Sequence, residues 1–264
     1  MSPLDIDRIK KRLQAKRLGG KFHYFTELGS TNVHARRLAE NAAAEGEFVI
    51  AEAQTHGRGR LGRRWESPPG VNLYLSVILR PRLRPVHAAQ ITLMAAVALA
   101  ESIAPLIKQA PVIKWPNDIL VNGRKLAGVL TEAACDPERI DYVILGIGLN
   151  LNYRAISMPP EIRLRATSVA DLTGNPIDRE SVTVRLIHNL DRCYGELEEC
   201  GFEALRSRWD AFFGFRGRRV RIENHEQVVI GRALGIDGNG ALIIEDDFGE
   251  LRNIYAGDVI PLES

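Results

Sequence analysis

The stretch from Gln54 to Gly70 reads QTHGRGRLGRRWESPPG, and it decides between two classes of fold. Its segment Gly57–Gly62 fits the G-x-G-x-x-G template of dinucleotide-binding folds, and a predicted strand over 48–54 precedes it. The template requires a helix directly afterwards, because the N-terminus of that helix binds the pyrophosphate. Here Pro68 and Pro69 prevent such a helix, and no ribose-binding acid follows at the expected distance. We therefore expect a loop and reject the dinucleotide-binding fold.

Glycines and arginines alternate in this loop, a combination suited to binding anions. Glycine lets the backbone approach a ligand closely and donate its N–H groups. Arg58 and Arg60 supply planar, permanently charged groups that match carboxylate and phosphate oxygens. Two such side chains could hold a carboxylate beside a phosphate, although these anions repel each other. From these residues alone, an exposed basic loop or a nucleic-acid patch is the alternative.

The segments around the loop combine both periodicities, so we expect helices and strands together, as in an α+β domain. Asn122–Gly123 between apolar runs predicts a tight hairpin. At the start of the chain, a basic run is the expected solvated face of an amphipathic helix whose buried side carries Ile6, Ile9 and Leu13. We expect further helices over 32–44, 87–108 and 178–213, and strands over 22–28, 48–54, 72–79 and 142–151.

The pattern of apolar and turn-forming residues in the sequence changes near Gly214. Short apolar runs separated by turns follow, including the tight turn Asp237–Gly240, which suggests a small β-barrel. We predict two domains, 1–214 and 215–264, with the smaller packed on the larger.

Composition sets limits on the class of protein. The chain has 264 residues with 45% hydrophobic and 26% charged residues, which are ordinary globular values. A net charge of +2 gives no indication of nucleic-acid binding, and three cysteines without metal-ligand spacing fit a reducing compartment. The longest apolar region, 91–107, is interrupted by Glu101 and Pro105, so we expect a buried helix. With no signal-peptide pattern at the start, we expect a cytoplasmic protein that does not bind membranes.

Six blocks, in order and including the loop, resemble the biotin protein ligase family over residues 25–152. They are GSTN (29–32), QTHGRGRLGRRW (54–65), GVNLYLS (70–76), KWPND (114–118), RKLAG (124–128) and GIGLN (146–150). The resemblance implies a mixed sheet with helices, distantly like class II synthetases, followed by a small SH3-like barrel. It also implies a short form of the family without an N-terminal helix-turn-helix repressor domain, since about 20 residues precede the first predicted strand.

The resemblance assigns one group of residues to biotin. Ser30, Thr31, Asn32 and Gln54 match positions that bind the ureido ring, whose carbonyl and two N–H groups need hydroxyl and amide partners. Without the resemblance, Ser30–Thr31 would be a helix cap. In addition, Arg58, Gly59 and Arg60 match a lid over biotin and the adenylate, and Lys125 matches a contact to the carboxylate and the α-phosphate.

The resemblance assigns a second group to the nucleotide and to the reaction. Trp65, Lys114, Asn117 and Asn150 match nucleotide contacts, together with Arg60 and Lys125. Asp118 matches an acid beside the reaction centre, so the implied catalytic residues are Arg60, Lys114, Asp118 and Lys125. By default Trp65 would be a core residue and Lys125 a solvated one. Gly146 and Gly148 would be small because ligand or backbone passes close by. No metal ligand is predicted.

The implied activity is ATP-dependent biotinylation of a lysine on a biotin carboxyl carrier protein through biotinyl-5′-AMP, with Mg²⁺ accompanying ATP. The resemblance permits a homodimer. A lipoate or octanoate ligase is the nearest rival interpretation. A nucleic-acid-binding module is the rival from another class, although aromatic residues make up only 6% of the chain.

Overall fold

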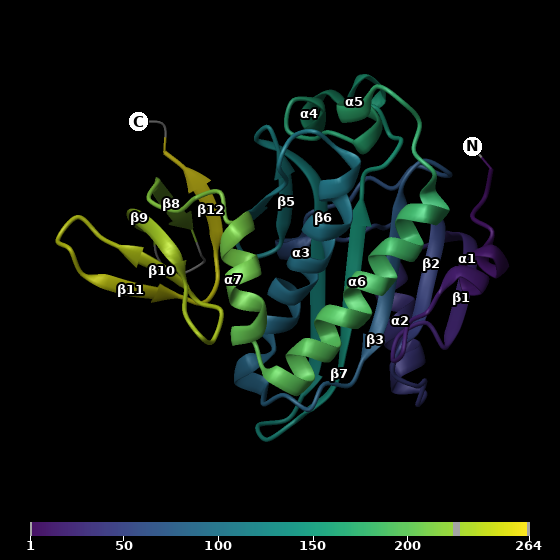
Figure 1. Cartoon of the computed structure of the whole chain (residues 1–264), viewed down its shortest axis with the longest axis horizontal. Helices are drawn as coiled ribbons and strands as arrows, with labels where there is room; N and C mark the ends of the chain where they lie inside the picture. The colour runs from purple at the N-terminus through teal and green to yellow at the C-terminus, as the bar shows by residue number, and fades with distance from the viewer. Residues whose placement is uncertain (1, 224–227, 263–264) are drawn as a thin grey trace.

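The computed structural model describes residues 2–223 and 228–262, which form two β-sheets with helices packed around the larger sheet (Figure 1). The larger sheet has the order β1-β2-β3-β7-β6-β5-β4, with β1 and β2 parallel and the other neighbours antiparallel. It is therefore mixed, which confirms the predicted α+β class. Its strands are β1 (Lys21–Leu28), β2 (Glu47–Gln54), β3 (Leu73–Leu79), β4 (Val112–Lys114), β5 (Asp118–Val121), β6 (Arg124–Cys135) and β7 (Ile140–Leu149).

The predicted strands are present within two residues of their predicted ends. The predicted hairpin is also confirmed: Asn122 and Gly123, with φ of 51° and 73°, join β5 to β6. Positive φ at both turn positions gives the twist that a two-residue hairpin needs, and glycine and asparagine adopt it at least cost.

The described helices are α1 (Ile6–Arg12), α2 (Thr31–Glu40), α3 (Ala89–Ile103), α4 (Pro160–Arg163), α5 (Val169–Thr173), α6 (Arg179–Cys200) and α7 (Glu203–Phe212). The predicted extent of two helices was wrong. The helix expected over 32–44 ends at Glu40, because Ala42 takes a left-handed φ of 60°. The region expected to be helical over 178–213 divides at Gly201, whose φ of 74° ends α6.

The pleat of the large sheet sorts its side chains onto two faces. On β3, Leu75 and Val77 belong to the main core with residues of α3 and α6. Ile78 points the other way and packs with Ala35 and Ala39 of α2. Helices α3 and α6 therefore cover one face, and α2 covers part of the other.

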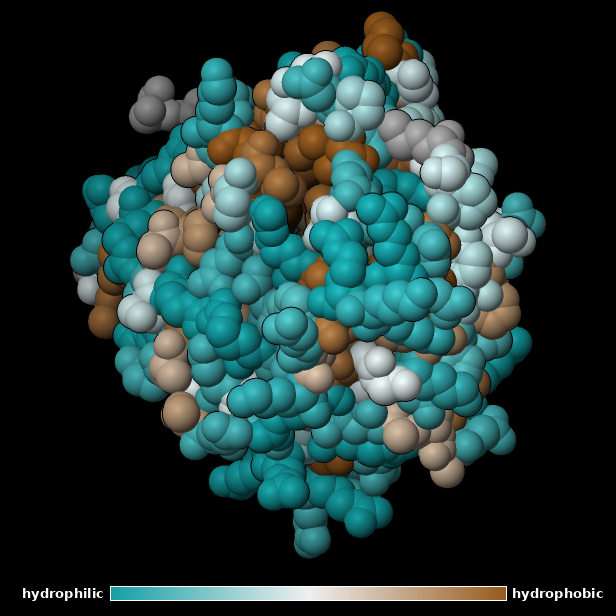
Figure 2. All heavy atoms as spheres, turned by 45° about the vertical axis from the view of Figure 1, so that its right-hand side comes forward, coloured by the Kyte–Doolittle hydropathy of each residue, from teal (hydrophilic) through white to brown (hydrophobic). Residues whose placement is uncertain are grey.

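The apolar helix predicted near residues 87–108 is α3, extended by 3-10 turns to Pro85–Leu106. By length and composition it could cross a membrane, but 67% of its most apolar window is buried inside the protein. It contacts α6 and α7 as well as β4, β5 and β6. It is a core helix. The surface seen in Figure 2 is mostly hydrophilic, and one group of apolar residues surrounds a hollow in the upper part of this face.

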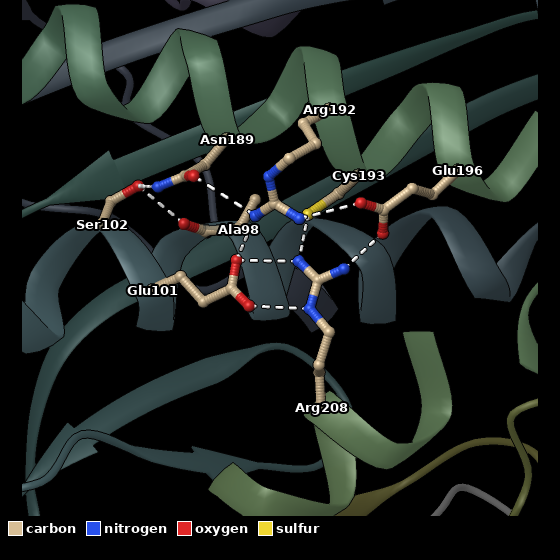
Figure 3. Close-up of polar contacts among 8 residues, drawn as sticks. All are labelled: Ala98, Glu101, Ser102, Asn189, Arg192, Cys193, Glu196 and Arg208. Atoms are coloured by element: carbon tan, nitrogen blue, oxygen red, sulfur yellow. Dashed lines mark hydrogen bonds and ion pairs between the residues drawn. The ribbon is translucent and has the colours of Figure 1, made fainter. Parts of the chain in front are cut away.

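An ion-pair network joins α3, α6 and α7 (Figure 3). Arg208 of α7 donates to both oxygens of Glu101 on α3, at 2.7 and 2.8 Å, and also to Glu196 on α6. Arg192 bonds to the same two acids. Arg208 Nη2 lies 3.1 Å from Cys193 Sγ. Burial raises the pKa of that thiol to about 11, so it stays protonated. The network fixes the helices that cover one side of the sheet.

The smaller sheet has five antiparallel strands in the order β11-β10-β9-β8-β12. Its turn at Asp237–Gly240 packs on the larger part, where the Trp115 indole donates to Gly240 O at 3.1 Å. The predicted SH3-like barrel and the boundary between 214 and 215 stay predictions. The strands are β8 (Arg219–Glu223), β9 (Val228–Ile236), β10 (Leu242–Glu245), β11 (Leu251–Ile254) and β12 (Asp258–Pro261).

Candidate active site

A cavity of about 210 Å³ lies on the face of the large sheet that α2 covers. Its walls come from the start of α2, the loop after β2, the strands β6 and β7, the segment 153–166 and the first residue of β12. The sequence-predicted residues that line it are Ser30, Thr31, Asn32, Gln54, Arg58, Gly59, Arg60, Trp65, Asn117, Asp118, Lys125 and Asn150. Segments far apart in the chain thus meet at one site.

The buried end of the cavity is the start of α2. Ser30 occupies the N-cap position, but its side chain makes no capping hydrogen bond. Instead Gln54 Oε1 accepts from Thr31 N at 2.9 Å and from Thr31 Oγ1 at 3.1 Å. The same amide donates through Nε2 to Ser67 Oγ at 3.0 Å. Ser30 therefore takes the predicted N-cap position, but Gln54 and not the Ser30 hydroxyl satisfies the first backbone amide of α2.

Asn32 is oriented from three sides. Its Oδ1 accepts from Ser76 Oγ at 2.6 Å, and its Nδ2 donates to Leu130 O at 3.2 Å and to Glu132 Oε2 at 2.8 Å. An amide nitrogen carries two hydrogens and an amide oxygen has two lone pairs. Both hydrogens are thus engaged, and the oxygen retains capacity for one more donor.

Two glycines of β7 make room for side chains that line the cavity. A Cβ on Gly146 would lie 2.0 Å from Asn32 Oδ1, and one on Gly148 would lie 2.4 Å from Cε2 of the Trp65 indole. The nearest atoms to these two glycines are side chains and not backbone. Both glycines line the cavity, so the close passage of a ligand stays a prediction. Any larger residue would displace Asn32 or Trp65 from the cavity wall.

The loop predicted over 55–70 lacks long regular elements, but it is ordered by its own contacts. Arg58 and Arg64 form a short antiparallel bridge, and Trp65 N donates to Gly57 O at 2.9 Å. A 3-10 turn spans Arg60–Gly62, where Leu61 has a φ of 56°. These contacts place the indole of Trp65 at the cavity wall rather than in the core.

The two arginines that were predicted to form a lid have different partners. Arg58 Nη1 lies 3.6 Å from Glu132 Oε1. Arg60 Nη1 donates to Asn117 Oδ1 at 3.1 Å and lies 3.6 Å from Asp258 Oδ1 on β12. Burial lowers the pKa of Arg60, and Asp258 opposes that shift. The positive charges therefore stand on two sides of the cavity.

Lys125 contacts both the carboxylate of Asp118 and the ring of Trp65. Its Nζ lies 2.7 Å from Asp118 Oδ1 and 5.3 Å from the centre of the Trp65 ring, which gives an ion pair and a cation–π contact. About a third of its side chain is exposed. The default interpretation of Lys125 as a solvated lysine was wrong, since it faces the cavity.

Lys114 and Asn150 are placed less directly. Among the described residues, Lys114 lies outside the cavity lining, on β4 opposite Asp118. Burial lowers its pKa, and Asp118 is the first charge that opposes this. Asn150 lines the cavity, but it accepts from Asn72 Nδ2 and donates to Thr167 O, each at 3.1 Å. These bonds fix the end of β7.

Sequence reasoning missed several residues of the site. Glu132 and Ser76 hold Asn32, and Asp258 faces Arg60 from the second sheet. Ser76 was quoted only as the end of a matching block. Alternation along a strand could have indicated Glu132, because it lies on the same face of β6 as Gly128 and Leu130. The described residues contain no group of three or more His, Cys, Asp or Glu side chains that could hold a metal ion.

Comparisons with known proteins agree with this geometry. The sequence model described as "Biotin/lipoate A/B protein ligase family" matches residues 24–150, and the one described as "Biotin protein ligase C terminal domain" matches residues 215–260. The biotin–[acetyl-CoA-carboxylase] ligase of Mycobacterium tuberculosis is 36% identical over 267 residues, covering 98% of this chain and 96% of that protein. The chain belongs to the biotin protein ligase family.

Two further matches support the assignment of this chain to the biotin protein ligase family. The bifunctional ligase/repressor BirA of Bacillus subtilis is 36% identical over 256 residues, which are 97% of this chain and 78% of that protein. The structure of the Aquifex aeolicus biotin protein ligase in complex with biotin and ATP matches with a TM-score of 0.79 and 28% identity. That match covers 93% of this chain and all of the other.

Proposed function

We propose that this ligase joins biotin to a lysine of a biotin carboxyl carrier protein in two steps, through biotinyl-5′-AMP. The acetyl-CoA-carboxylase ligase named above suggests the class of acceptor, and the A. aeolicus complex suggests biotin and ATP as substrates. The residues of the cavity support both.

The observation that carries the proposal is the hydrogen-bonding capacity at the buried end of the cavity. Asn32 Oδ1 can accept one more hydrogen bond, and Gln54 Nε2 has a second hydrogen beyond its bond to Ser67. Biotin's ureido ring offers two N–H donors and one carbonyl acceptor. A mixed set of acceptors and donors is the complement of such a ring, whereas an aliphatic tail would leave these buried groups unpaired. This favours biotin over lipoate or octanoate.

In the first step, a carboxylate oxygen of biotin attacks the α-phosphorus of ATP, and pyrophosphate leaves with the electrons of the broken P–O bond. Two anions must approach each other, so the site has to supply positive charge. Arg58, Arg60 and Lys125 supply it at the cavity, each through charge-assisted hydrogen bonds of about 1.5–3 kcal/mol. Lys114 adds positive charge from β4, the strand next to β5 in the sheet, and is proposed to act on the phosphates.

In the second step, the acceptor lysine amine attacks the acyl carbon, AMP leaves, and the amine loses a proton. At pH 7 deprotonation of an ordinary lysine costs roughly 4–5 kcal/mol. We propose that Asp118 orients the incoming ammonium group, because its carboxylate already binds an ammonium, that of Lys125, at 2.7 Å.

Trp65, Asn117 and Asn150 are the proposed contacts for the nucleotide. Trp65 offers an aromatic face next to Lys125, and Asn117 is held by its bond to Val129 O at 2.8 Å. Mg²⁺ is proposed to enter with ATP as part of the substrate. This ion is commonly held by phosphates and one or two carboxylates, and Asp118 is such a carboxylate at the cavity.

The direct test is to incubate the protein with ATP, Mg²⁺ and either biotin or lipoate, and to identify the acyl-adenylate by mass. We expect biotinyl-5′-AMP with biotin and no adenylate with lipoate. A lipoyl-adenylate, or no adenylate with either acid, would contradict the proposal. Cytoplasmic location, a homodimer and the absence of nucleic-acid binding stay predictions.

A further inference from the structure

Glu132 lies at the junction of the biotin-binding helix and the lid. Its carboxylate extends from β6 and is mostly buried, with 17% of the side chain exposed. Oε2 accepts from Asn32 Nδ2 at 2.8 Å, and Oε1 accepts from Arg36 Nη2 at 2.9 Å. Arg58 Nη1 approaches the same Oε1 at 3.6 Å. One acid thus contacts two residues of α2 and one lid arginine.

A carboxylate constrains Asn32 because it can only accept hydrogen bonds. The amide must therefore turn its nitrogen toward Glu132 and its oxygen toward Ser76 and the cavity. Gly146 leaves room for the oxygen in this orientation, since a Cβ there would be 2.0 Å from Asn32 Oδ1. Asn32 is thereby limited to accepting from a ligand.

We propose that Glu132 is a positioning residue that sets the selectivity of this ligase for a ring N–H. It fixes Asn32 as an acceptor, so a ligand that carries an N–H at this point is bound and one that carries an acceptor is rejected. This inference rests on the proposed function, because it assumes that the ureido ring lies beside Asn32.

The charge of Glu132, and not only its shape, carries the effect. A glutamine at this position would place its NH₂ group either against the cations of Arg36 and Arg58 or against the NH₂ group of Asn32. The first arrangement opposes two positive charges, and the second can be relieved if Asn32 reverses its amide. The reversed amide would present N–H groups to the cavity, where biotin also presents an N–H. Glu132→Gln should therefore change which ligands fit.

The contact with Arg58 gives Glu132 a second consequence. Arg58 is one of the proposed anion-binding arginines, and among the described residues Glu132 is the one acid within ion-pair distance of it. Glu132 therefore holds Arg58 on the α2 side of the cavity until an anionic ligand competes for this arginine. Loss of the acid frees this arginine at the same time as it frees Asn32.

The test measures binding of biotin and of two analogues by calorimetry, each analogue with one ureido N–H replaced by oxygen. The wild-type protein is compared with Glu132→Gln and with Arg36→Met, which removes a cation from the same carboxylate but leaves its bond to Asn32. We expect wild type and Arg36→Met to prefer biotin over at least one analogue by more than 10-fold. In Glu132→Gln that preference should fall at least 10-fold.

Ligand preference separates positioning from a general loss of structure. A Glu132→Gln protein that binds biotin and both analogues weaker by the same factor, or that keeps the wild-type preference, would overturn the inference. If Glu132→Gln does not fold, Glu132→Asp takes its place. This variant keeps a carboxylate acceptor on a shorter side chain, so it should retain the preference for biotin over the analogue. Failure of the wild type to form biotinyl-5′-AMP would overturn the proposed function itself, and that result is independent of the analogue series.

Discussion

Two clusters of cationic side chains and carboxylates lie on opposite faces of the same sheet. They differ in how many of the cations' hydrogen-bond donors already have partners within the protein. In the helix network, the guanidinium of Arg208 donates hydrogen bonds to Glu101, Glu196 and the thiol of Cys193 (Figure 3). In the cavity, Arg58 and Lys125 each have one acid within ion-pair distance among the described residues. The same residue types therefore stabilise helix packing where their donors are used up. Where donors remain available, they can bind an anion.

The comparison predicts its largest effect for Lys125→Ala, on the rate of adenylate formation. Removing a cation that stabilises the approach of carboxylate and phosphate should slow adenylate formation by about 10²–10³-fold. The affinity for biotin should change by only a few fold. Single-turnover formation of biotinyl-5′-AMP and calorimetric binding of biotin measure the two quantities. Lys21→Ala, on an exposed strand end, is the matched control, and equal losses of both quantities in Lys125→Ala would contradict a role in the chemical step.

The next effect concerns retention of the intermediate. Arg60→Gly removes one side of the proposed anion-binding lid, so biotinyl-5′-AMP should dissociate about 10–100-fold faster, as expected for the loss of one or two charge-assisted hydrogen bonds. Arg64→Gly introduces the same flexibility into the same loop without removing this contact. An unchanged dissociation rate in Arg60→Gly, measured by rapid filtration, would remove Arg60 from the lid.

The helix network should respond in stability and not in chemistry. Arg208→Met leaves two partly buried acids without their main partner and should lower the free energy of unfolding by about 2–3 kcal/mol. Adenylate formation should stay within twofold of wild type. Arg206→Met on the same helix removes only an exposed pair with Glu203 and should cost less than about 1 kcal/mol. A large activity loss in folded Arg208→Met would show that the two clusters are coupled.

The smallest effect is on the pH dependence of stability. Burial raises the pKa of Glu101, but the hydrogen bond from Arg208 and further contacts outweigh it, so the pKa lies below its ordinary value. A carboxyl group whose pKa is lowered by folding adds stability above its unfolded pKa of about 4.3, and this stability is lost as pH falls through the folded value. The difference in unfolding free energy between wild type and Arg208→Met should therefore shrink below about pH 4. Chemical denaturation at pH 7, 5 and 3.5 measures it, and a constant difference would contradict the assignment.

The sequence predicted the elements that depend on local patterns. Short apolar runs located the strands, Asn122–Gly123 located the hairpin, and the glycines and prolines after Gln54 located the loop. The blocks that resemble the family then supplied most of the cavity lining. These signals are short-range or are carried by contiguous motifs, so they can be read without knowing the fold.

Long-range partners could not be predicted in the same way. Glu132 lies 100 residues from Asn32, and Asp258 reaches Arg60 from another sheet. In the helix network only Arg192–Glu196 has the i,i+4 spacing that a helix predicts, whereas Arg208 and Glu101 are 107 residues apart. The end of α2 also depended on the left-handed turn at Ala42, a position where nothing in the residue type predicts positive φ.

The central claim is that Arg58, Arg60 and Lys125 neutralise the repulsion between an organic acid and a nucleotide. A crystal structure with a non-hydrolysable biotinyl-adenylate analogue tests it most directly. We expect all three side chains within hydrogen-bond distance of the acyl or phosphate oxygens, with Arg58 and Arg60 released from Glu132 and Asp258. An analogue bound in the cavity with these three residues still on their present partners and remote from its oxygens would contradict the claim.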